Sequence, residues 1–135
     1  MNATLDEALQ LFGAGNRDRT SFLLLVESGR APHETVGFLA QQACEKFLKA
    51  VLAYRGISPE RTHDLEYLAE MATKAGIRLP IAVERLRQLN PYAVALRYEG
   101  SEIVWVTEEQ AQEMVEAIHR WADDIFTNEH DDSAG

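Results

Sequence analysis

The chain has 135 residues, a net charge of −9 and a single cysteine, Cys44. This length suits one domain with a single core, and one cysteine excludes an intramolecular disulfide and a cysteine-rich zinc site. The acidic balance argues against non-specific nucleic-acid binding, and no apolar run is long enough to span a membrane. No signal sequence is recognisable at the N-terminus, so we expect a soluble cytoplasmic protein.

The charge is unevenly distributed along the chain. Residues 107–135 carry one basic side chain against nine acidic ones, whereas residues 46–97 carry nine basic side chains against five acidic ones. A local basic pocket in the middle of the chain is therefore compatible with the acidic total. We interpret the acidic end as a solvated helix face that leads into a tail.

The first predicted helix covers residues 4–28. Thr4 and Glu7 form a capping-box pattern, and Gly29 is a stop signal after the last apolar positions. A Gly-Ala-Gly sequence near the middle weakens this helix without ending it, because each glycine costs only about 1 kcal/mol. We expect one long or kinked helix.

The central predicted helix, over residues 32–55, organises the fold. Pro32 suits a first turn, and the following Gly56 suits a left-handed cap. Apolar residues recur at three- and four-residue spacings over most of its circumference, so we place it in the middle of a bundle. One narrow strip stays polar, and two interpretations of it are open. It is either a solvated face or the lining of a cleft or dimer interface, and in the second case its lysines would contact phosphate. This polar strip consists of Gln42, Glu45, Lys46 and Lys49.

Shorter helical segments follow the central helix. Thr62 is the predicted cap of a third helix, which ends at Gly76. Pro80 opens a fourth segment, and the Asn-Pro pair at residues 90–91 breaks it. We expect a further short turn at residues 92–98.

The last predicted helix has the most regular apolar spacing in the chain. Residues 103–106 have a strand-like composition, but no second strand is available for pairing, so we expect an extended connection there. Thr107 and Gln110 then form a second capping box. The sequence predicts a helix that starts here and leads into a flexible acidic tail over residues 128–135.

These elements predict an all-α fold, an antiparallel up-and-down bundle of four to five helices in one domain over residues 1–127. The sequence contains no phosphate-binding glycine loop, serine elbow or Glu-x-x-His metal pattern. Cys44 has no obvious histidine partner for nucleophilic catalysis. We therefore expect no catalytic residue, metal or tightly bound cofactor.

Two polar spots outside the strip are candidates for contact with an anion. One is the start of the third helix, where amides and the helix dipole favour anions, unless the polar residues there only cap the helix. The other lies at residues 97–98, where an arginine is either an anion hook or half of a structural ion pair. The candidate ligand-binding residues are Gln42, Glu45, Lys46, Lys49, His63, Asp64, Arg97 and Tyr98.

Several segments form a specific combination: residues 41–50 (QQACEKFLKA), 56–57 (GI), 61–65 (RTHDL), 91–98 (PYAVALRY) and 107–111 (TEEQA). This combination resembles the HEPN family over residues 14–127. The resemblance implies a small helical bundle that commonly forms homodimers and often works with a minimal nucleotidyltransferase in a toxin–antitoxin-like two-gene system. Some members of the family bind nucleotides, and others are metal-independent ribonucleases.

The ribonuclease branch of the family uses an arginine that is followed, after four to six residues, by a histidine. No arginine and histidine in this sequence have that spacing. The resemblance therefore implies a non-catalytic module that binds a nucleotide such as ATP or the nucleotidyltransferase, with Lys46, Lys49, His63 and Arg97 as anion contacts. Two alternatives stay open: a ribonuclease that brings Arg97 and His63 together in space, and a structural protein that dimerises through its apolar helix surfaces.

Overall fold

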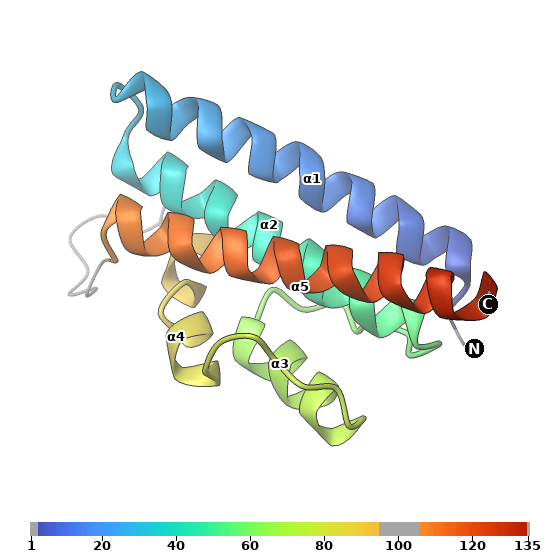
Figure 1. Cartoon of the computed structure of the whole chain (residues 1–135). Helices are drawn as coiled ribbons and strands as arrows, with labels where there is room; N and C mark the ends of the chain where they lie inside the picture. Colours follow the sequence, from blue (N-terminus) through green and yellow to red (C-terminus); the bar gives the residue numbers. More distant parts are fainter. Residues whose placement is uncertain (1–2, 95–105, 135) are drawn as a thin grey trace.

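Five α-helices and one 3₁₀ helix make up the described part of the chain (Figure 1). The computed structural model describes residues 3–94 and 106–134, and of residues 129–134 it describes only the backbone. No strand occurs within these ranges, so the predicted all-α class is confirmed. The elements are α1 (Leu5–Ser28), α2 (His33–Tyr54), α3 (Leu65–Lys74), α4 (Val83–Arg87), η1 (Asn90–Ala93) and α5 (Glu108–Ala134).

None of the helices in the described ranges combines the length and the apolarity that a membrane span requires.

Helix α1 is continuous, as the sequence predicted. The side chain of Thr4 accepts a hydrogen bond from the amide of Glu7, whose carboxylate accepts one from the amide of Thr4, and Gly29 ends the helix with φ at +67°. Gly15 has a packing role, because a Cβ there would lie 2.8 Å from the ring of Phe47 on α2. This glycine therefore allows α1 and α2 to approach closely.

Helix α2 is the central helix of the bundle, which confirms the prediction from its apolar pattern. It packs against α1, α3, α5 and η1, and its buried residues lie on more than one face. Pro32 is the residue before the first helical turn, and Gly56 follows the end of the helix with φ at +80°. Buried side chains from every α-helix converge on α2 in one core.

The three long helices do not all run in the same direction. Helix α1 runs antiparallel to both α2 and α5, whereas α2 and α5 run in the same direction (Figure 1). Tyr54 at the end of α2 packs on Phe126 near the end of α5, with ring centroids 4.6 Å apart. The parallel pair arises because α3, α4 and η1 return the chain to the starting end of α2 before α5 begins.

Tyr92 on η1 joins the starting ends of α2 and α5. Its ring is fully buried, and its hydroxyl lies 2.6 Å from Nε2 of His33 and 3.1 Å from the amide nitrogen of Val106, from which it accepts a hydrogen bond. Burial raises the pKa of this phenol to about 12. Gly37 on α2 lies directly against the ring. This contact holds η1 and the segment before α5 onto the central helix.

The boundaries of the short helices differ from the sequence predictions. Asp64, rather than Thr62, caps α3, because its carboxylate accepts hydrogen bonds from two amides of the first turn. Helix α4 covers only Val83–Arg87, since Ala82 keeps an extended backbone with ψ at 144°. The predicted break at residues 90–91 coincides with the start of η1.

The capping box predicted at the start of the last helix is confirmed. Thr107 and Gln110 exchange the two hydrogen bonds of a capping box at the start of α5. The predicted turn at residues 92–98 and the extended segment at residues 103–106 lie mostly outside the described residues. The backbone of α5 stays helical to Ala134, into the segment for which we predicted a flexible tail.

Candidate functional site on α2

The polar strip of α2 is partly buried. The side chain of Glu45 is 5% exposed and that of Lys49 is 14% exposed, while Lys46 keeps a more exposed edge. A buried charge needs a partner to offset its lost hydration. The solvated-face interpretation is therefore wrong for Glu45 and Lys49, which belong to a polar network that joins α2 and the segment before α3.

Glu45 is the centre of this network. Its Oε1 lies 2.8 Å from Nδ1 of His63, and its Oε2 accepts a hydrogen bond of 3.0 Å from Nζ of Lys49. Nε2 of Gln41 contacts the same Oε1 at 3.3 Å and donates to the backbone carbonyl of His63 at 2.9 Å. Both carboxylate oxygens are engaged, and no buried side-chain nitrogen or oxygen in the described part of the chain lacks a partner.

Two residues that contact the polar strip were not predicted as site residues from the sequence. Gln41 is fully buried next to the strip, where it also accepts a hydrogen bond of 2.7 Å from Nε2 of Gln42. Asp18 on α1 forms an ion pair with Lys46. An amide within an apolar stretch was a usable signal for Gln41, but no local pattern connects Asp18 with a helix nearly thirty residues away.

His63 and Asp64 are neighbours with different roles. The side chain of His63 is 71% exposed, so the ring presents most of its surface to solvent while one nitrogen faces the buried carboxylate. Asp64 points into α3, where Oδ1 accepts from the amides of Glu66 and Tyr67 and from Nδ2 of Asn90. The capping interpretation is thus supported for Asp64, because its carboxylate occupies the place of an external anion.

Arg97 and Tyr98 lie outside the described residues, so the structure does not place them relative to the polar network. Their proposed role as anion contacts stays a prediction. Of the eight candidate residues, the structure brings four into one hydrogen-bonded network, namely Gln42, Glu45, Lys49 and His63. Lys46 lies on the same strip but pairs with Asp18 of α1.

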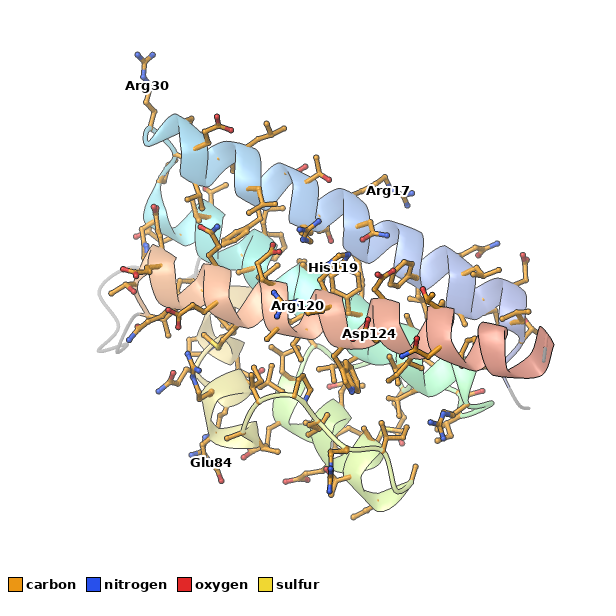
Figure 2. The ribbon with its side chains drawn as sticks, viewed as in Figure 1. Arg17, Arg30, Glu84, His119, Arg120 and Asp124 are labelled. Carbon is orange, nitrogen blue, oxygen red and sulfur yellow. The ribbon has the colours of Figure 1, made fainter. Side chains whose placement is uncertain are left out.

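A second group of charges lies between α1 and α5. Nε and Nη2 of Arg19 each donate a hydrogen bond of 2.8 Å to the carboxylate of Glu116. This pairing holds the pKa of the Glu116 carboxyl below its usual range. Figure 2 shows His119 between these helices, where it packs against Phe12 and Phe47. Burial and the charge of Arg19 lower the pKa of His119, which favours the neutral imidazole. This group is a structural contact between helices.

The described residues contain no cluster of three or more histidine, cysteine, aspartate or glutamate side chains arranged to hold a metal ion. Burial raises the pKa of the Cys44 thiol to about 12, so this cysteine is held in the un-ionised, unreactive form.

The fold and the network together define a helical domain with a partly buried polar site on its central helix. Comparison with protein families matches the HEPN domain over residues 8–123. The chain belongs to the HEPN family, as its motifs indicated. Comparison with curated proteins gave no match, and comparison with solved structures gave none either.

Proposed function

We propose that this chain is a non-catalytic HEPN module that binds a nucleotide such as ATP at the polar network of α2. The observation that supports it is the position of Lys46 at the exposed edge of the strip, with Lys49 on the same strip and the His63 ring open to solvent. Lysine and histidine are donors that suit phosphate oxygens. A polyphosphate contacts the network from its exposed side.

The ion pairs of the network differ in how easily a ligand can replace them. The pair of Lys46 and Asp18 is partly exposed, and such pairs contribute about 0–1 kcal/mol. The pair of Lys49 and Glu45 is shielded, so its separation would leave a buried charge without a partner. Phosphate therefore competes with Asp18 for Lys46, while Lys49 and Glu45 stay together and hold His63 in place.

Two substitutions at this pair should have opposite effects on ATP binding. Lys46→Ala removes a phosphate donor and should weaken binding about tenfold or more. Asp18→Asn removes the competing carboxylate and should strengthen binding about two- to fivefold. Isothermal titration calorimetry at low ionic strength measures both, with Lys74→Ala on α3 as an exposed lysine control. Unchanged affinity in both variants, or no saturable heat with the folded wild-type protein, would show that a nucleotide does not bind at this site.

The partners of this module are part of the same proposal. We propose a homodimer and a small nucleotidyltransferase as the partners, on the basis of family membership. Sedimentation equilibrium tests the homodimer. Co-purification with the product of a neighbouring nucleotidyltransferase gene tests the second partner. A stable dimer that binds neither nucleotide nor nucleotidyltransferase would favour the purely structural alternative.

One observation favours a ribonuclease as the second candidate function. Glu45 holds one nitrogen of His63 at 2.8 Å while the ring stays exposed, which is how a carboxylate orients a histidine for acid–base chemistry. This candidate requires cleavage of RNA in the presence of a chelator, and the activity has to disappear in His63→Ala. Intact RNA after incubation with the wild-type protein would exclude it.

A further inference from the structure

An apolar groove lies at the end of the bundle where α1 begins and α5 ends. Phe12, Tyr54 and Phe126 form its floor, with ring centroids of Phe12 and Phe126 4.8 Å apart and those of Tyr54 and Phe126 4.6 Å apart. Leu5 and Leu9 form one wall, and the groove has a volume of about 440 Å³. Apolar concavities of this size bind side chains of other molecules.

The leucines of the wall are unusually exposed for their position. Leu5 is 59% exposed and Leu9 is 51% exposed, although both belong to the stripe of α1 that continues into Phe12 of the floor. Residues at these spacings lie on one face of a helix. The apolar stripe of α1 thus extends past the core of the domain, and its first residues are exposed to solvent along the groove.

The surroundings of the groove are acidic. Asp123 is the charged residue of its lining among the described residues. Residues 3–12 contain two acidic and no basic side chains, and a second carboxylate, Asp124, follows Asp123 on α5, whereas Arg55 lies at the end of α2. The local potential is therefore negative.

The negative potential around the groove favours some binding partners over others. A symmetric dimer places the same surface of both subunits in contact. Dimerisation through this groove would bring two acidic ends together, and facing like charges are unfavourable. An anionic lipid surface is disfavoured for the same reason. A segment with apolar side chains on one face and basic side chains on the other satisfies both the apolar floor and the acidic rim.

We propose that the groove binds a basic amphipathic helix of a partner protein. Leucine-like side chains of that helix enter between Leu9 and Phe126, and its lysines or arginines face Asp123 and Asp124 of α5. Helix-in-groove binding of this kind uses apolar anchors for affinity and charge for specificity. The proposal is independent of nucleotide binding, because it uses none of the residues of the polar network on α2.

The test is binding of two designed helical peptides to the full chain, measured by fluorescence anisotropy. One peptide carries leucine on one face and lysine on the other, and the second carries glutamate in place of lysine. We expect saturable binding of the lysine peptide, weakened by salt, and no binding of the glutamate peptide. Leu9→Glu should reduce the affinity at least about tenfold, because it places a carboxylate at the apolar wall.

Leu24→Glu is the matched control, since Leu24 is 60% exposed on the same helix but lies outside the groove. Equal thermal unfolding of both variants shows that the fold is intact. Equal binding of the two peptides, absence of lysine-peptide binding, or equal affinities of the two variants would overturn the proposal. A dimer that Leu9→Glu dissociates and Leu24→Glu leaves intact would also overturn it, because the groove would then belong to a second copy.

Discussion

Gly37→Ala should lower the free energy of unfolding by about 3 kcal/mol or more, at the upper end of the range for overpacked cores. A Cβ at this position of α2 would lie 2.0 Å from the ring of Tyr92, far inside van der Waals contact. The ring is fully buried, and its hydroxyl is fixed by His33 and Val106. The tyrosine can therefore move only if the link between α2, η1 and the start of α5 is broken.

Urea unfolding followed by circular dichroism measures this change, and Gly13→Ala is its control. A Cβ at Gly13 of α1 would meet only the end of the Arg17 side chain at 3.7 Å. This control should raise the stability by about 0.5–1 kcal/mol, the usual advantage of alanine in a helix. A similar small gain in Gly37→Ala would show that Tyr92 is not packed against α2 as the structure describes.

Gly37 also shows what the sequence can and cannot predict about the fold. From its neighbours it is only a weak point near the start of a helix, because the residue that requires it follows 55 positions later. The caps at Thr4, Gly29 and Thr107 were predicted correctly, since each depends on residues within one helical turn. The shared direction of α2 and α5 depends on long-range packing and was not predicted.

The same distinction applies to the candidate site. Periodicity alone placed the polar residues of α2 on one strip, and the polar start of the third helix added His63. Periodicity could not show that Glu45 is buried, that Gln41 turns towards it, or that Asp18 of another helix pairs with Lys46. Partners that approach from different elements leave no pattern within either element, so the sequence predicted the members of the network better than its contacts.

Glu45→Ala should destabilise the domain by about 3–5 kcal/mol, the cost of removing one partner of a buried ion pair. The substitution leaves Nζ of Lys49 without the carboxylate oxygen that it contacts at 3.0 Å, in a side chain only 14% exposed. It also removes one hydrogen bond of Gln41 and the contact that fixes the His63 ring. Urea unfolding at neutral pH measures the loss.

Glu66→Ala is the matched control, because Glu66 forms an exposed ion pair with Arg87 and its loss should cost about 0–1 kcal/mol. The double variant Glu45→Ala/Lys49→Met identifies the cause. If the unpaired ammonium of Lys49 dominates, replacing it by an apolar side chain should recover most of the stability, since buried ion pairs are often no more stabilising than apolar contacts. If the double variant is as unstable as Glu45→Ala, the loss arises from the contacts with Gln41 and His63. The network would then serve mainly to fix the segment before α3, rather than to keep Lys49 charged beside a ligand.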